Sequence, residues 1–459
     1  MFLEKVKAAG LAHVSYVIGD GNEAAVIDPR RDVDVYLDIA RKQGARITRV
    51  FETHRNEDYA IGSLNLQRIA GADIFHGAGG VDFAYGEEVK EGATCELGDV
   101  KLEVLSTPGH TDESISVAFY DKSFSGDTAL GVFTGDAMFV GDVGRTDFFP
   151  DRAEEVAGLL YDSLFGKLIP LGDQTLIYPA HGAGSVCGSN MADRDFSTIG
   201  YERQHSMPLQ HTDRRDFIKL KVSEQHFYSP WFKRMEEWNK MGAPPMDRLP
   251  EPRALNATEL SKARDGNITI LDTRSVEAFA AAHIPGSYNI PLSMISAFAG
   301  WFLPYDQPIG LVVKDPAEVE EAVRHLIWIG YDDVVAFLAD GIEAWQTAGH
   351  EYGTIEPVHV RDLVDDIKRK GTVILDVRSP EEFAEGHLEG AINLYVGHVD
   401  QKIDEIPRDG SITTFCGSGR RAGVAASILK QRGFERVRNC LGSMSACESV
   451  GCSVVTEGE

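Results

Sequence analysis

Short apolar runs separated by glycine- and proline-rich turns fill the first 205 residues, and this pattern predicts a strand-rich region. Residues 13–18 and 24–28 are two such runs, and the turn between them predicts a β-hairpin. Apolar positions at helical spacing predict a helix over residues 32–43. This mixture indicates the α/β class, with further strands expected at residues 46–50, 101–105, 115–119, 131–134 and 175–178.

A proline-rich stretch, residues 244–252, divides the chain. Two segments before it, residues 214–219 and 231–239, have helix-like apolar spacing. Consecutive prolines permit neither helical nor ladder hydrogen bonds. We therefore expect the first domain to occupy residues 1–250, with a helical extension at its end.

Beyond the prolines, residues 270–289 and 374–393 are two copies of one pattern. Corresponding positions are 104 residues apart, which indicates a duplicated domain rather than a solenoid repeat. Each copy alternates strand and helix, as in a mainly parallel sheet flanked by helices. We expect these domains at residues 251–356 and 357–459, each with an Asp-x-Arg pair that ties a strand to the next helix: Asp272 and Arg274, Asp376 and Arg378.

Composition narrows the classes of partner and compartment. The formal net charge of −26 argues against a nucleic-acid-binding surface. No stretch is apolar for long enough to span a membrane, and the N-terminus lacks the pattern of a secretion signal. The six cysteines are few and irregularly spaced, so we expect free thiols in a reducing compartment. These observations predict a cytoplasmic protein.

Potential metal ligands follow four of the predicted strands. His54 and Asp58 come after residues 46–50, His110 follows 101–105, Asp136 follows 131–134, and His181 follows 175–178. A histidine after a strand is weak evidence by itself, but five such residues in order favour a metal site. Ligands on loops at strand ends, held by a rigid sheet, are typical of such sites.

The segment after Asp136 carries a Gly-Arg-Thr-Asp sequence at residues 144–147. With the ligand-type residues, it resembles the glyoxalase II and persulfide dioxygenase branch of the metallo-β-lactamase fold. The resemblance covers residues 1 to about 205 and implies an αβ/βα sandwich with the site at one sheet edge. The usual His-x-His-x-Asp-His motif is altered here, because Asn56 and Tyr59 stand where the family has histidines.

Loss of two imidazoles removes one ligand from each ion of a two-zinc site. His54, His110 and Asp136 remain, and two histidines with one carboxylate suit a non-heme Fe(II) centre. The resemblance implies one iron per chain, with zinc an alternative in the isolated protein. Asp58 and His181 would then orient ligands or water, and with Tyr59 and Asn56 they are also the candidates for a second metal ion. Tyr59 would hydrogen-bond into the pocket.

Cys187 follows His181 closely and suits either a sulfur-handling or a structural role.

Cys416 ends a predicted strand and is followed by Gly417, Ser418 and Gly419, then by Arg420, Arg421 and a predicted helix over residues 421–432. Backbone N–H groups of such a loop can point at the sulfur, and this field with the two arginines favours a thiolate. Both repeats resemble the rhodanese family, in which this cysteine carries sulfane sulfur as a persulfide.

The first repeat has no cysteine between residues 253 and 356 and carries Asp315 at the matching junction. We therefore interpret it as an inactive packing domain. Cys440, Cys447 and Cys452 match no common zinc pattern. They are expected to be small core residues.

The whole chain resembles bacterial fusions of a persulfide dioxygenase with two rhodanese domains that detoxify sulfide. The resemblance implies oxidation of a thiol persulfide, of glutathione or an analogue, by O2 to thiol and sulfite, with thiosulfate as the combined product. A homo-oligomer is expected. A zinc thioester hydrolase and a non-catalytic scaffold or sensor around an active rhodanese remain open, and a flavodiiron-type oxidase is disfavoured because no flavin-binding domain follows.

Overall fold

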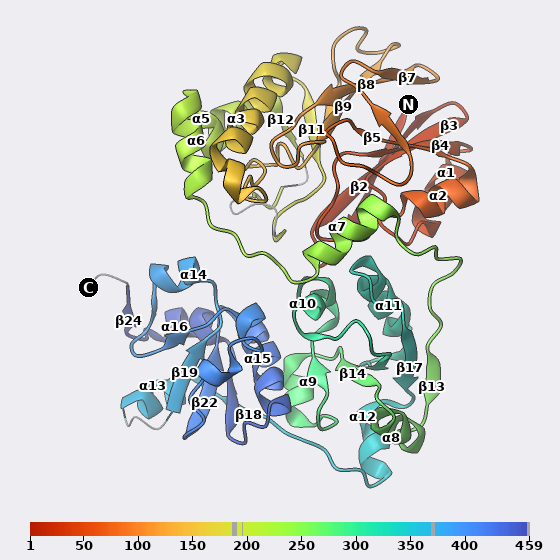
Figure 1. Ribbon diagram of the computed structural model, residues 1–459. Coiled ribbons are helices and arrows are strands. Elements are labelled where there is room, and N and C mark those ends of the chain that lie inside the picture. Colours follow the sequence, from red (N-terminus) through yellow and green to blue (C-terminus); the bar gives the residue numbers. More distant parts are fainter. Residues whose placement is uncertain (186–190, 195, 369–371, 457–459) are drawn as a thin grey trace. The chain divides into compact units, whose positions relative to one another are not determined.

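The computed structural model describes residues 1–185, 191–194, 196–368 and 372–456. It forms two compact units (Figure 1). Met1–Leu249 with Ile327–Gly330 make up the first, and Pro250–Leu326 with Tyr331–Glu459 make up the second.

Two six-stranded sheets form the centre of the first unit. In spatial order, one contains β1 (Phe2–Ala8), β2 (His13–Asp20), β3 (Glu23–Ile27), β4 (Arg46–Glu52), β5 (Asp73–Gly77) and β6 (Glu87–Val89). The other contains β12 (Ser197–Thr198), β11 (Leu176–Pro179), β10 (Gly131–Gly135), β9 (Ile115–Asp121), β8 (Val100–Ser106) and β7 (Thr94–Leu97). The helices are α1 (Asp34–Lys42), α2 (Ser63–Ala70), α3 (Ala153–Ser163), α4 (Ile199–His205), α5 (Met207–Gln210), α6 (Arg214–Ser223) and α7 (Phe232–Met241).

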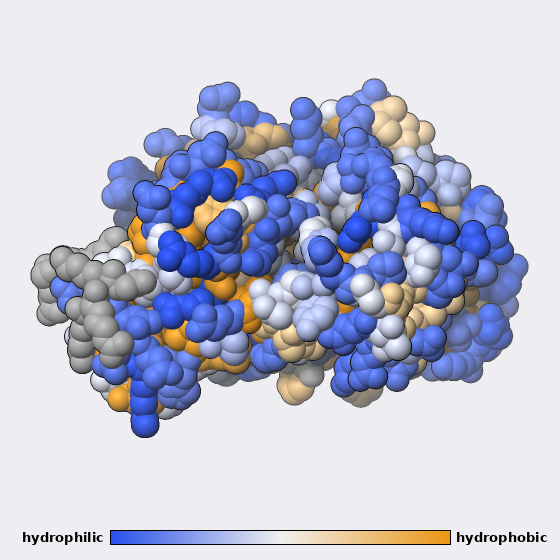
Figure 2. All heavy atoms as spheres, turned by 90° about the horizontal axis from the view of Figure 1, so that it is seen from below, coloured by the Kyte–Doolittle hydropathy of each residue, from blue (hydrophilic) through white to orange (hydrophobic). Residues whose placement is uncertain are grey.

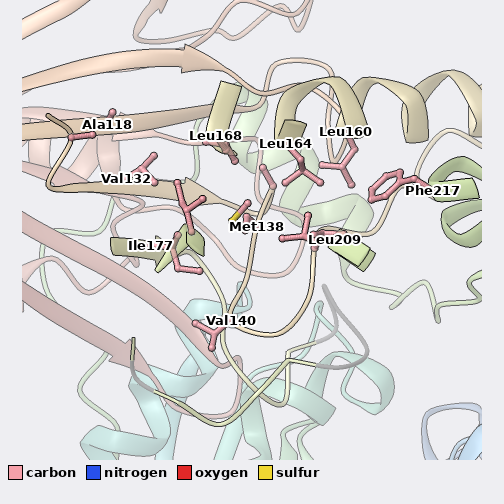
Figure 3. Close-up of a cluster of buried hydrophobic side chains, with 14 of the residues drawn as sticks. Ala118, Val132, Met138, Val140, Leu160, Leu164, Leu168, Ile177, Leu209 and Phe217 are labelled. Carbon is pink, nitrogen blue, oxygen red and sulfur yellow. The ribbon is translucent and has the colours of Figure 1, made fainter. Parts of the chain in front are cut away.

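Three apolar clusters separate these elements into four layers. One packs Tyr36 of α1 and Leu66 of α2 against the first sheet. A second, which includes Tyr16 and Phe119, lies between the sheets. The third packs α3 and α6 on the second sheet, with Phe217 among its members (Figure 3). Burying each large apolar side chain contributes about 1.5–3 kcal/mol. The predicted αβ/βα sandwich, hairpin and first helix are confirmed.

The second unit contains two five-stranded parallel sheets with matching strand orders. The first repeat has the order β13 (Arg253–Leu255), β17 (Val334–Leu338), β16 (Ile309–Val312), β14 (Thr269–Asp272) and β15 (Tyr288–Asn289). The second has β18 (Glu356–Val358), β23 (Val437–Cys440), β22 (Ser411–Phe415), β19 (Thr372–Asp376) and β21 (Ile392–Asn393).

Helices flank both sheets, as the repeat pattern predicts. They are α8 (Ala257–Asp265), α9 (Val276–Ala281), α10 (Ile295–Phe302), α11 (Val319–Trp328) and α12 (Gly341–Thr347), then α13 (Val360–Lys368), α14 (Pro380–Glu385), α15 (Arg420–Gln431) and α16 (Ser443–Val450). A short antiparallel pair, β20 (His387–Leu388) with β24 (Val454–Val455), completes the unit.

The Asp-x-Arg pairs have the predicted structural role. Arg274 binds the carboxylate of Asp272 and donates to the carbonyl of Ala282 at 2.8 Å. Arg378 does the same with Asp376 and the carbonyl of Gly386. Each buried guanidinium therefore joins the end of a strand to the residue that follows the next helix.

The expectation of free thiols is wrong for Cys447 and Cys452, which form a disulfide. Gly451, at φ +71°, reverses the chain at the end of α16 and brings the two Cα atoms within 5.0 Å, inside the range for a disulfide. Two cysteines five residues apart would not come this close if the helix continued, so their spacing gave no indication of a disulfide. Cys440 and Cys447 do lie in the core of the second repeat, as predicted.

The described part of the chain contains no helix that is both long and apolar enough to cross a bilayer. Hydrophilic residues cover most of the face shown in Figure 2, with hydrophobic ones in smaller areas between them. This surface agrees with a content of charged residues, 25%, that is typical of globular proteins.

Candidate functional site

Donor atoms of His54, His110 and Asp136 meet in the interior of the first unit. Nε2 of His54 lies 3.8 Å from Oδ2 of Asp136, and Nε2 of His110 lies 3.6 Å from the same oxygen. All three side chains are buried, and within the described residues these three atoms have no hydrogen-bond partner. Since buried polar atoms are nearly always paired, this convergence fits a metal ion.

The other ring nitrogen of His54 is held by a short relay. Thr53 Oγ1 lies 2.9 Å from His54 Nδ1 and donates its proton to Asp28 Oδ2 at 2.7 Å. Nδ1 must then carry the proton that it gives to Thr53, which leaves Nε2 as a lone-pair donor. Burial lowers the pKa of His54 to about 4, so its ring is neutral. Gly135 permits this packing, because a Cβ there would lie 2.6 Å from Thr53 Oγ1.

The Gly-Arg-Thr-Asp segment holds His110. Its Nδ1 donates to the carbonyl of Arg145 at 3.1 Å, so Nε2 is the nitrogen available to an ion once it gives up its proton. Burial acts to lower the pKa of His110, but the carboxylates of Glu57 and Asp136 outweigh burial and raise this pKa. Two 2.6 Å bonds from Arg145 to Asp147 fix the arginine. Gly144 lies so close to Asp136 that a Cβ would be 2.0 Å from its carbonyl oxygen. The segment thus positions two candidate ligands at once.

His181 lies between two carboxylates. Its Nδ1 is 2.8 Å from Asp136 Oδ1, and its Nε2 is 3.0 Å from Asp58 Oδ2. Both ring nitrogens are therefore engaged by protein. This arrangement orients Asp136 so that its second oxygen faces His54 and His110.

Asn56 and Tyr59 do not join the donor cluster. Asn56 Nδ2 donates to the carbonyl of His54 at 3.2 Å. Tyr59 Oη donates to the carbonyl of Asp28 at 3.3 Å, and its ring packs on His13 at 4.0 Å between centroids. The prediction that Tyr59 hydrogen-bonds into the pocket is therefore wrong, because this main-chain carbonyl takes its hydroxyl.

Sequence reasoning missed Glu57. The carboxylate is 2% exposed, and its Oε2 lies 3.5 Å from His110 Nε2, longer than a good hydrogen bond. Burial acts to raise the pKa of Glu57, but the neighbouring His110 and His54 outweigh burial and lower the pKa to about 2. Donor atoms of His54, Glu57 and His110 all lie within 4.8 Å of one another. In the sequence, Glu57 stands between two altered motif residues, and nothing there identifies it as a ligand.

Cys416 lies at the end of β22, where backbone N–H groups surround its sulfur as predicted. The amides of Gly419 and Ala422 donate to Sγ at 3.1 and 3.4 Å. Gly419 has φ +92°, and a Cβ there would lie 3.1 Å from the carbonyl oxygen of Cys440. Glycine is therefore favoured at this turn, since L side chains rarely adopt such a backbone.

The arginines beside Cys416 have defined partners. Arg421 makes two bonds of 2.6 and 2.7 Å to Glu382 at the start of α14. Arg420 donates to Ser293 Oγ of the first repeat at 2.6 Å. At the matching junction of the first repeat, Asp315 accepts from the amide of Ala317 at 2.9 Å and so caps the short helix Pro316–Glu318.

Comparison with known proteins places these sites in families. A model of the metallo-beta-lactamase superfamily matches residues 8–181, and one of the rhodanese-like domain matches residues 256–348 and 359–449. The crystal structure of a metallo-beta-lactamase from Staphylococcus aureus is 32% identical, with a TM-score of 0.66, covering 74% of this chain and 98% of that chain. The chain belongs to the metallo-β-lactamase superfamily and carries two rhodanese-like domains.

Curated relatives of the metallo-β-lactamase domain have two different activities in their names. Persulfide dioxygenase ETHE1 of Bos taurus is 30% identical over 176 residues, which cover 36% of this chain and 63% of the relative. A hydroxyacylglutathione hydrolase of Polaromonas sp. is 34% identical over 165 residues, covering 35% and 57%. The chain thus spans 57–63% of the length of these relatives.

Helix α7 holds the loop of residues 54–61 in the metallo-β-lactamase domain, which we call the ligand loop because it begins with His54. Asn239 Nδ2 donates to the carbonyls of Asn56 and Tyr59 at 2.7 Å each, and its Oδ1 accepts from the amide of Ile61 at 2.9 Å. Trp231 Nε1 donates to the carbonyl of Asp58 at 2.9 Å. Apolar spacing predicts the helix, but nothing in the sequence indicates that its buried Asn239 binds this loop.

Replacing Asn239 by alanine is expected to destabilise the metallo-β-lactamase domain. The change leaves three buried backbone groups without a partner, so we expect a loss of about 3 kcal/mol. The urea midpoint should fall with little change in the slope of the transition. Glu237→Ala, on the exposed face of α7, is the matched control, and equal midpoints for the two variants would contradict the role of Asn239.

Glu52, at the end of β4, supports the same helix through Tyr85. Burial raises the pKa of Glu52 to about 8. Tyr85 Oη lies 3.1 Å from both carboxyl oxygens and 2.8 Å from the carbonyl of Asn239. The Tyr85 hydroxyl therefore links the Glu52 carboxyl group to the main chain of α7.

This pKa predicts a pH dependence of stability. The folded domain holds a proton on Glu52 that the unfolded chain releases near its ordinary pKa of 4.5. The raised pKa of Glu52 contributes fully to the free energy of unfolding below that pH, and this contribution is lost as the pH rises through about 8. Each unit of difference between the folded and unfolded pKa corresponds to about 1.4 kcal/mol. Glu52→Gln should therefore lose less stability than the unmodified chain between about pH 5 and about pH 9 in urea titrations. Parallel curves would contradict the assignment.

Cys187 lies outside the described residues.

Proposed function

We propose that the metallo-β-lactamase domain is an iron-dependent persulfide dioxygenase and that Cys416 transfers sulfane sulfur. One observation carries the proposal: the unpaired donor atoms of His54, His110 and Asp136 converge, while Nδ2 of Asn56 and the hydroxyl of Tyr59 donate to main-chain carbonyls. Two imidazoles and one carboxylate suit a single Fe(II) ion with open positions. A two-zinc site needs more ligands than remain.

A bound Fe(II) ion would supply the redox chemistry by which O2 oxidises the terminal sulfur of a thiol persulfide. The reaction R–S–SH + O2 + H2O gives R–SH, sulfite and two protons. The sulfur–sulfur bond breaks, the sulfane sulfur is oxidised and O2 is reduced. The chain's own contribution is to hold the donor atoms in place through Thr53, Arg145 and His181.

The second rhodanese-like domain can use the product. Sulfite attacks the outer sulfur of a Cys416 persulfide, thiosulfate leaves, and the Cys416 thiolate is released. The amides of Gly419 and Ala422 stabilise the negative charge on that sulfur. The low-molecular-weight thiol would be glutathione or an analogue.

Thioester hydrolysis with zinc is the second candidate, because a hydroxyacylglutathione hydrolase is 34% identical over 165 residues. The experiment is anaerobic reconstitution with Fe(II), followed by addition of glutathione persulfide and oxygen. We expect O2 uptake with an equal amount of sulfite, and thiosulfate when excess persulfide is present. Zinc-dependent thioester cleavage without O2 consumption would overturn the proposal.

A further inference from the structure

We propose that Glu57 is a fourth protein ligand of the metal ion, next to His54, His110 and Asp136. The ligand loop has two motif residues, Asn56 and Tyr59, that cannot supply an imidazole. Glu57 stands between them, at a position that is not a ligand in the usual motif. This inference takes from the proposed function only that the site binds a divalent ion.

Geometry supports this role. Atoms bound to one ion at about 2.1 Å lie about 3.0–3.4 Å apart when they are neighbours in its coordination shell. Oε2 of Glu57 is 3.5 Å from His110 Nε2, close to the 3.6 Å between His110 Nε2 and Asp136 Oδ2. Glu57 is thus as close to His110 as the carboxylate that the family uses, and it lies within 4.8 Å of the donor atoms of both His54 and His110.

The backbone explains how this side chain reaches the cluster. The amide of Asn56 donates to the carbonyl of His54 at 3.0 Å, which makes a tight turn directly after the first ligand. Asn239 then holds the carbonyls of Asn56 and Tyr59 on either side of Glu57. The loop is therefore fixed at both flanks, and the Glu57 side chain turns to the buried face.

Charge supports the role as well. Imidazoles bind a metal in the neutral form, so the two carboxylates would supply a formal charge that a divalent cation cancels. Buried charges require such compensation. Four protein ligands would leave two positions of a six-coordinate ion for small molecules.

The test is Co(II) binding by the full chain stripped of metal, with stoichiometry, affinity and visible absorption as readouts. We expect one Co(II) per chain, and Glu57→Gln should weaken binding by about 100-fold or more and change the d–d bands, since even residues that only orient ligands contribute about 10–100-fold. Glu202→Gln is the matched control, because this buried carboxylate binds the amide of Gly141 instead.

Equal affinity and equal spectra for Glu57→Gln and the unmodified chain would overturn the inference. If Glu57→Gln does not fold, Glu57→Asp applies the same test, because it keeps the charge and withdraws the carboxylate by one methylene. An unchanged spectrum of that variant would also overturn it. This test measures metal binding and not O2 uptake. Its result is therefore independent of whether the domain is a dioxygenase.

Discussion

Replacing His110 by alanine is expected to abolish O2 consumption while sulfur transfer at Cys416 continues. The imidazole nitrogen lies near both carboxylates, 3.6 Å from Asp136 Oδ2 and 3.5 Å from Glu57 Oε2, so its removal is expected to leave a site too weak to retain an ion through purification. Metal content after purification should fall to background. The oxygen electrode should record less than about 1% of the original rate, because loss of a central ligand removes the reaction's cofactor.

The same variant separates the proposed function from a scaffold. If the metallo-β-lactamase domain only supports an active rhodanese, His110→Ala changes no measurable activity. His211→Ala is the control, since this histidine follows α5 and lies outside the donor cluster. Thermal unfolding of both variants should be compared, because truncating a buried ring also costs packing energy.

Replacing Cys416 by serine is expected to abolish sulfur transfer and to leave O2 uptake intact. A hydroxyl is not ionised at neutral pH and forms no persulfide, although it can accept the same two amide hydrogen bonds from Gly419 and Ala422. Persulfide, O2 and sulfite should then give sulfite without thiosulfate. The measurement is thiosulfate release, followed by chromatography.

Cys440→Ala is the matched control for that prediction. Burial raises the pKa of Cys440 to about 11, so its thiol stays neutral at physiological pH and cannot act as a nucleophile. We expect thiosulfate formation at the original rate. Thiosulfate release by Cys416→Ser would show that another thiol carries the sulfur.

Much of the fold could be predicted from local pattern. Alternation and turn residues located the hairpin of β2 and β3, and the duplicated Asp-x-Arg segments predicted two similar parallel sheets, because these signals depend on neighbours in the sequence. The candidate ligands His54, His110 and Asp136 were also identifiable, since each follows a strand and the strands end at one edge. Their convergence followed from topology.

The parts that could not be predicted depend on contacts between distant residues. Glu57 has no signal, because only its distance to His110 distinguishes it from an exposed acidic residue. Asn239 is separated by about 180 residues from the loop it holds. The disulfide of Cys447 and Cys452 depends on one left-handed glycine, and irregular spacing alone argued against it.

The bonds from α7 to the ligand loop bear on how this protein is divided for experiments. A fragment cut where the superfamily match ends, at residue 181, would keep every candidate ligand of the family pattern. It would lack Asn239 and Trp231, and with them four hydrogen bonds that shape the loop from Asn56 to Ile61. Such a fragment should therefore take up metal poorly despite an intact motif, and the minimal expression unit extends through α7.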